Sequence, residues 1–198
     1  MDAAEQKIRV FAGLKTPVKW DEELQAVQKR LAERIGSNGI RWVKAEQIHI
    51  TLRFFGHILI RDAADVAKIL ASVAVQCAPM TLRCEGIGCF PSARRPKVIW
   101  AGLKGDIERV AELQSAIAEA SAEIGEPPDH RPFKPHLTLA RVRELRPSKA
   151  RLLEDAGEEL RIEAPWNVHE LLLMRSHLSP EGSRYETIGS WRLEGKVL

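Results

Sequence analysis

The feature that most constrains the fold is an internal repeat. Three pairs of matching segments occur in the same order along the chain: FAGLK at 11–15 and WAGLK at 100–104, ELQ at 23–25 and at 112–114, and HITL at 49–52 and HLTL at 136–139. The first two pairs are 89 residues apart and the third 87, which a two-residue difference in one loop explains. We therefore predict one domain over 1–198 made of two pseudo-symmetric lobes, with repeat units of approximately 7–96 and 97–198.

The periodicity of apolar residues predicts that strands and helices alternate. Strands are expected at about 7–14, 40–43, 47–55, 80–89, 97–104, 136–142, 167–176 and 184–193, and amphipathic helices at about 21–35, 61–76, 106–124 and 148–160. Several strands follow one another without an intervening helix. This favours antiparallel pairing over a doubly wound parallel sheet.

The two His-x-Thr-x motifs lie in predicted strands. Residues two apart on a strand point to the same face, so His49 shares a face with Thr51 and His136 shares a face with Thr138. The apolar residues between them face the core. Because duplicated lobes tend to pack about a pseudo-two-fold axis, the motifs are expected to face each other across a cleft. The repeat thus predicts a groove with two imidazoles and two hydroxyls.

Two imidazoles suit proton transfer near neutral pH, because an unperturbed histidine has a pKa of about 6.5. A neutral imidazole can accept a proton from water while a protonated one donates to a leaving oxygen. Threonine hydroxyls add neutral donors for non-bridging phosphoryl oxygens. The pattern predicts acid–base cleavage of a phosphodiester that requires neither a metal nor a covalent intermediate.

Other catalytic patterns are missing from the sequence. There is no H-E-x-x-H, no carboxylate two residues after either motif histidine and no His–Cys cluster, so we expect no metal and no cofactor. The G-x-S-x-G pattern of serine hydrolases is also missing. The remaining histidines lack a comparable partner pattern and are interpreted as surface or structural residues: His57, His130, His169 and His177.

Composition indicates an ordinary globular protein. A net charge of +3 does not by itself predict nucleic-acid binding, and the basic runs RRPK at 94–97 and RVRELRPSKAR at 141–151 are interpreted as solvated surface. The three cysteines form no C-x-x-C pair, which fits a reducing cytoplasm. No apolar run approaches the roughly 20 residues of a membrane span, and the N-terminus does not resemble a signal peptide. We expect a cytoplasmic protein.

Four segments resemble one known family. IHITLRFFG, GCFPSARRPKVIWAGL at 88–103, RPFKPHLTLAR at 131–141 and MRSHLSPEGSRYE at 174–186 are similar to the bacterial and archaeal RNA 2′,3′-cyclic phosphodiesterases. These were named earlier as 2′-5′ RNA ligases and belong to the two-histidine (2H) phosphoesterase superfamily. The resemblance implies a bilobed α+β fold in which two antiparallel sheets flank a central cleft and helices lie on the outside.

The resemblance also implies an activity, namely hydrolysis of RNA 2′,3′-cyclic phosphate ends to 2′-phosphomonoesters. By motif position His49 corresponds to the proton donor and His136 to the proton acceptor, while Thr51 and Thr138 would hold the phosphate. A pseudo-symmetric site makes the two histidine roles hard to separate. Ligation in vitro would use the same residues.

Residues flanking the motifs are further candidates. Arg141 matches a family arginine near the phosphate, although strict strand alternation turns it away from His136, so it needs a bulge or a place at the strand's end. Arg53 lies on the predicted face of His49 and suits phosphate, with solvent exposure as the alternative. Phe11 and Phe133 could stack a base or pack in the core. The only tyrosine, Tyr185, resembles a family position near the cleft.

Three functions remain open at this point. The first is the RNA 2′,3′-cyclic phosphodiesterase. The second is a 2H enzyme that acts on a 2′,5′-linked oligonucleotide or a small cyclic nucleotide. The third is a non-catalytic nucleotide- or RNA-binding module, which would not require both imidazoles. Expected partners are RNA with 2′,3′-cyclic phosphate ends or small cyclic nucleotides, with no membrane and no obligate protein partner, and the protein is expected to be a monomer.

Overall fold

The computed structural model describes residues 5–128, 131–146, 149, 152–153, 160–179 and 182–195. In this part of the chain the α-helices are α1 (Asp21–Ile35), α2 (Ile60–Ala74) and α3 (Ile107–Ala120). The strands are β1 (Lys7–Lys15), β2 (Ile40–Trp42), β3 (His49–Leu59), β4 (Met80–Phe90), β5 (Val98–Gly105), β6 (Leu137–Val142), β7 (Arg161–Val168), β8 (Glu170–Ser179) and β9 (Gly182–Arg192). Two short 3-10 helices, η2 (Val18–Trp20) and η3 (Ala45–Gln47), precede α1 and β3. None of the described helices is long and apolar enough to cross a membrane.

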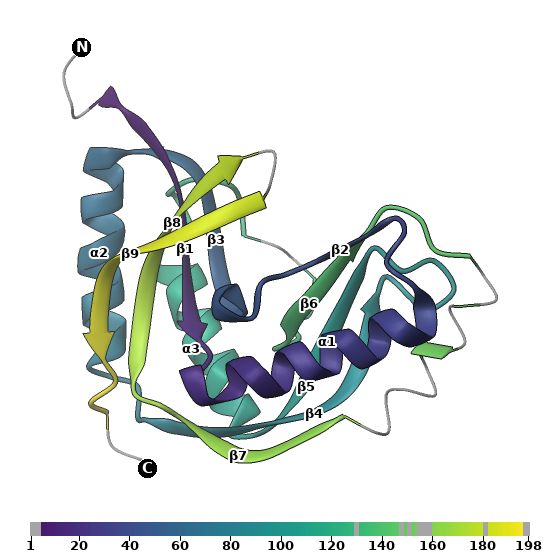
Figure 1. Ribbon diagram of the computed structural model, residues 1–198. Helices are drawn as coiled ribbons and strands as arrows, with labels where there is room; N and C mark the ends of the chain where they lie inside the picture. The colour runs from purple at the N-terminus through teal and green to yellow at the C-terminus, as the bar shows by residue number, and fades with distance from the viewer. Residues whose placement is uncertain are drawn as a thin grey trace.

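The strands form two antiparallel sheets, which confirms the predicted α+β class. Sheet A has the order β3-β1-β8-β9, and sheet B has the order β2-β6-β5-β4-β7. The two sheets are splayed like a V in Figure 1. Each sheet combines strands from both halves of the chain, because β8 pairs with β1 and β4 pairs with β5.

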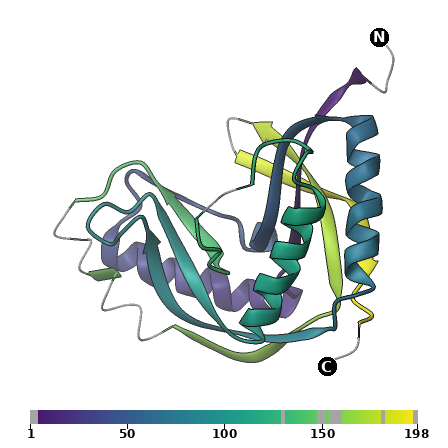
Figure 2. The ribbon, with the colours of Figure 1, turned by 180° about the vertical axis from the view of Figure 1, so that it is seen from behind.

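The helices cover the outer faces of the sheets. In Figure 2, which is seen from behind, α2 and α3 stand in front of sheet A, whereas α1 runs along sheet B in Figure 1. The buried residues of α1 recur at helical spacing and form one apolar stripe: Leu24, Val27, Leu31 and Ile35. On the same helix, Gln28 Nε2 donates to the carbonyls of Val43 at 2.6 Å and Leu139 at 2.9 Å. Thus α1 follows a strand of sheet A but is fixed to sheet B.

The structure differs from the predicted elements in the second half of the chain. The strand expected at 167–176 is in fact two strands, β7 and β8, which belong to different sheets and are separated at His169. Helix α3 ends at Ala120 rather than at 124, and a turn follows it. Most of the helix predicted at 148–160 falls outside the described residues.

Candidate active site

His49 begins β3, where the 3-10 helix η3 turns the chain into the strand. Its Nδ1 lies 2.7 Å from the carbonyl oxygen of Gln47. Because a carbonyl can only accept, Nδ1 carries the proton and Nε2 is the basic nitrogen of the neutral ring. The hydroxyl of Thr51 lies 3.0 Å from this Nε2. One hydrogen bond therefore fixes the tautomer of His49, and the predicted threonine stands beside its reactive nitrogen.

His136 repeats this arrangement directly before β6. Its Nδ1 lies 2.7 Å from the carbonyl oxygen of Lys134, so that Nε2 is again the basic nitrogen. Thr138 follows on the same strand and is half-buried. In both motifs the carbonyl two residues before the histidine orients the imidazole. The local backbone, and not a carboxylate, thus prepares each ring for proton transfer.

Two aromatic rings lie next to each imidazole. The ring of Phe11 stacks on His49 with centroids 4.7 Å apart, and Tyr185 meets the same imidazole edge-on at 5.0 Å. On sheet B, the centroid of Phe90 lies 5.0 Å from that of His136, and Trp100 lies 6.1 Å from it. These contacts restrict the orientation of the imidazoles.

The electrostatic surroundings keep both histidines neutral at pH 7. Burial lowers the pKa of His49 to about 4, the hydrogen bond to Gln47 opposes this, and the positive charges of Arg141 and of protonated His136 add to it. Burial also lowers the pKa of His136, and the charges of Lys134 and Arg141 contribute. Since Arg141 acts on both imidazoles and His136 acts on His49, the three groups lie close enough to interact electrostatically. Strands β3 and β6 approach to within 8 Å between Cα atoms.

A bulge brings Arg141 into this site. Ala140 pairs with Ile99 and Thr138 pairs with Trp100, so Leu139 is left without a partner in the ladder. The extra residue reverses the alternation, and Arg141 becomes exposed while Leu139 and Ala140 are fully buried. By sequence, Arg141 needs a bulge to share a face with His136, and the structure contains that bulge.

A matching bulge in β3 has the opposite effect on Arg53. Arg53 pairs with Ala12 and Thr51 pairs with Gly13, which leaves Leu52 unpaired. Arg53 is consequently only 4% exposed, and its guanidinium donates to the carbonyls of Ile124 at 3.3 Å and Glu126 at 2.5 Å. The structure thus places Arg53 not beside His49 but against the segment that follows α3.

The remaining candidates divide between the site and the core. Phe11 is 3% exposed and its stacking partner is His49, while Tyr185 is half-buried at the edge of that pair. Phe133 packs against the main hydrophobic core. The sequence-based interpretation missed the role of Trp100, although it aligns with Phe11 in the FAGLK and WAGLK repeat. Phe90 also contacts an imidazole, that of His136.

Among the described residues, no three His, Cys, Asp or Glu side chains gather in a way that could hold a metal ion.

Comparison with known proteins identifies the family. The family model of the 2′-5′ RNA ligase superfamily matches residues 16–180. A protein of Aeropyrum pernix named RNA 2′,3′-cyclic phosphodiesterase is 32% identical over 164 residues, which are 80% of this chain and 90% of the relative. A protein of Aquifex aeolicus with the same name is 27% identical over 195 residues, 95% of this chain and 98% of that one.

Solved structures agree in fold. The crystal structure of TT0787 of Thermus thermophilus superposes with a TM-score of 0.78 at 26% identity and covers 96% of this chain and 100% of that one. Escherichia coli LigT complexed with 3′-AMP has a TM-score of 0.71 at 22% identity, with 95% and 99% of the two chains covered, and shows the same fold. The chain therefore belongs to the 2′-5′ RNA ligase superfamily.

Proposed function

We propose that this protein hydrolyses RNA 2′,3′-cyclic phosphodiester ends to 2′-phosphomonoesters by general acid–base catalysis with His49 and His136, and that the reaction needs no metal. The observation that carries the proposal is the matched pair of imidazoles. Each has its Nδ1 bound to a backbone carbonyl, and both lie within electrostatic range of Arg141. The relatives named RNA 2′,3′-cyclic phosphodiesterase support the same activity.

The two histidines act in one displacement at phosphorus. Nε2 of neutral His136 accepts a proton from water as the water oxygen attacks phosphorus. The bond between phosphorus and the 3′ oxygen breaks, and protonated Nε2 of His49 donates its proton to that oxygen. The phosphate remains on the 2′ oxygen, and the next turnover begins after the proton on His136 is exchanged for one on His49.

Neutral and charged donors stabilise the phosphoryl oxygens during this step. Thr51 and Thr138 donate from their hydroxyls, and Arg141 supplies a guanidinium that fits phosphate geometry. Positive charge near the phosphoryl oxygens stabilises the negative charge that develops on them in the transition state. With a 5′-hydroxyl of a second RNA in place of water, the same geometry would form a 2′-5′ linkage.

The decisive experiment uses an RNA that ends in a 2′,3′-cyclic phosphate, incubated with the protein in EDTA. Phosphorus NMR should show a 2′-phosphomonoester. A 3′-phosphate, no turnover, or turnover that EDTA abolishes would contradict the proposal. A 2′,5′-linked oligonucleotide and a 2′,3′-cyclic mononucleotide, assayed in parallel, distinguish the alternative substrates.

Variants then test the roles of the histidines. His49→Ala and His136→Ala should each lower the rate about 10²–10⁴-fold, the usual contribution of a positioned acid or base. His57→Ala is the matched control, because His57 is exposed on the same strand as His49 and takes no part in the site. Near wild-type activity in either site variant would rule out the two-histidine mechanism.

A further inference from the structure

Two arginines lie directly opposite each other at the edge of sheet B. Arg41 of β2 pairs with Arg141 of β6, which in turn pairs with Val98 of β5. Both arginines are exposed. Cross-strand partners share a face of the sheet, and Arg141 already belongs to the candidate active site. Arg41 therefore extends the same face by one strand beyond the catalytic groups.

This pairing has no explanation in the stability of the fold. Like charges directly opposite on neighbouring strands destabilise a sheet. Within the part of the chain that the structure describes, no ion pair joins Arg41 or Arg141 to a carboxylate. Two arginines that are paired across neighbouring strands, with no acidic partner among the described residues, are the arrangement expected where an anionic ligand supplies the compensating charge.

The side chain of Arg41 also crosses from one sheet to the other. Its guanidinium lies against Gly182, the first residue of β9 in the hairpin of sheet A, and a Cβ atom at Gly182 would collide with it. Figure 1 shows this hairpin facing β2 across the space between the sheets. The guanidinium of Arg41 therefore lies close to the hairpin of sheet A while it remains exposed, and the glycine at position 182 leaves room for it.

Further cations continue the surface beyond Arg41 and Arg141. Arg94, Arg95, Lys97 and Arg143 are all exposed. The two basic segments are joined there by two hydrogen bonds. The main-chain N–H of Val142 donates to the carbonyl of Lys97 at 2.9 Å, and the side-chain Nζ of Lys97 donates to the carbonyl of Arg143 at 3.5 Å. The basic runs that the sequence suggested to be solvated surface therefore meet at one end of sheet B, next to the site.

We propose that Arg41 binds the phosphate on the 5′ side of the terminal nucleotide, and that the RNA chain leaves the site over the edge formed by β2 and β6. This inference rests on the proposed function, because it assumes that the cyclic phosphate lies between His49 and His136. Arg141 serves that cyclic phosphate, and Arg41 serves the next one along the strand. The protein should consequently prefer substrates that carry a phosphate at this position.

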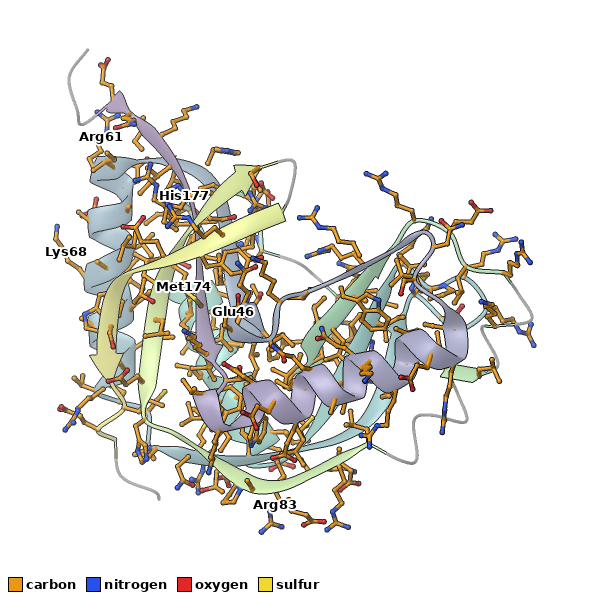
Figure 3. The ribbon with its side chains drawn as sticks, in the orientation of Figure 1. Glu46, Arg61, Lys68, Arg83, Met174 and His177 are labelled. Atoms are coloured by element: carbon orange, nitrogen blue, oxygen red, sulfur yellow. The ribbon has the colours of Figure 1, made fainter. Side chains whose placement is uncertain are left out.

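The test compares three substrates: a nucleoside 2′,3′-cyclic phosphate, the same compound with a 5′-phosphate, and a pentanucleotide that ends in a 2′,3′-cyclic phosphate. Arg41→Gln should reduce the ratio of kcat/KM for the pentanucleotide to kcat/KM for the unphosphorylated mononucleotide about tenfold, equal to about 1.4 kcal/mol of lost phosphate binding. The 5′-phosphorylated mononucleotide should lose its advantage as well. Arg83→Gln is the matched control, because Arg83 is exposed on β4 and Figure 3 shows it projecting away from the β8–β9 hairpin.

Equal losses on all three substrates, or no loss on any, would overturn the assignment of Arg41. A binding measurement keeps the test independent of catalysis. Fluorescence anisotropy with a pentanucleotide that ends in a 2′-O-methyl 3′-phosphate should show weaker binding by Arg41→Gln than by Arg83→Gln, and a salt dependence reduced by about 0.7 in slope, the value for one phosphate of a single strand. If the wild type binds but never turns over, the proposed function fails while this comparison still decides the role of Arg41. Identical binding by the two variants would refute it.

Discussion

Binding of a phosphodiester should raise the pKa of His49 by about 3 units. In the free protein this pKa is lowered to about 4, so at pH 7 only about one molecule in a thousand carries the proton that His49 must donate. An anion in the site acts in the opposite direction. At an effective dielectric constant of about 20, a unit negative charge about 4 Å from the imidazolium contributes about 4 kcal/mol, equal to about 3 pKa units.

The expected pKa of His49 in the complex is therefore about 7, which is suitable for a general acid at neutral pH. The catalytic proton would then be taken up together with the substrate, and the free enzyme would not carry it. A ligand that favours the protonated form must bind more tightly as the pH falls, because affinity is reduced by the fraction of protein in the competent state. The affinity should increase about tenfold for each pH unit of decrease between the pKa of the complex and the pKa of about 4 in the free protein, and should level off below that.

NMR titration of the histidine Cε1–Hε1 signals measures both values. A 2′-O-methyl dinucleotide is a suitable ligand, because its phosphodiester keeps one negative charge across the titration and cannot be cyclised. His49→Gln identifies the signal of His49, and the signal of exposed His57 serves as a control that should not respond to the ligand. A pKa that remains near 4 in the complex, or one already near 6.5 in the free protein, would refute the reasoning.

Three further predictions concern neighbouring residues. Arg141→Gln should raise the pKa of both His49 and His136, because it removes a positive charge that lowers them, and should raise KM about tenfold; NMR titration and steady-state kinetics measure the two effects. Arg53→Met should lower the free energy of unfolding by about 1–3 kcal/mol, because buried carbonyls lose their donors, and urea titrations measure this change. A raised KM at unchanged stability would instead place Arg53 at the substrate. Gly88→Ala should reduce kcat/KM roughly 10–100-fold, because its Cβ would overlap the indole ring beside His136 and displace it; unchanged kinetics would show that the ring has no positioning role.

Much of the fold could be predicted from apolar periodicity, but β7 could not. Its buried residues alternate as expected for a strand, at Ile162, Trp166 and Val168. Pro165 interrupts the pattern, and proline normally excludes a central strand. The structure resolves the conflict because β7 lies at the edge of sheet B, where a residue without an N–H is tolerated.

The faces of the candidate site residues could be predicted where strand alternation holds, and Arg53 was misplaced where it breaks. His49, Thr51, His136 and Thr138 precede the bulges, so their shared faces follow from spacing alone. Beyond each bulge the side chains point to the opposite face from the one that simple alternation predicts. The order of residue types does not reveal which leucine is left unpaired in the ladder. The expectation for Arg53 differed from the structure for this reason.

The internal duplication stays a prediction, and several features of the structure are consistent with it. The first three strands of sheet A, β3-β1-β8, correspond in order to β6-β5-β4 of sheet B. Both motifs share the bulge, the carbonyl bond to Nδ1 and the pair of flanking rings. The edges differ, because β2 adds the strand that carries Arg41 to sheet B alone. We infer that this asymmetry gives the RNA chain one direction of exit.

Because each sheet contains strands from both halves of the chain, the two halves cannot unfold independently. A fragment that ended near residue 96 would leave β1 without β8 and β4 without β5. Neither this fragment nor the remaining C-terminal one would retain a complete sheet. The chain should therefore unfold in one cooperative step, without a stable half-molecule. The spacing between the two imidazoles is then a property of the whole molecule: no hinge between independent bodies sets it, and it persists only while both sheets are intact.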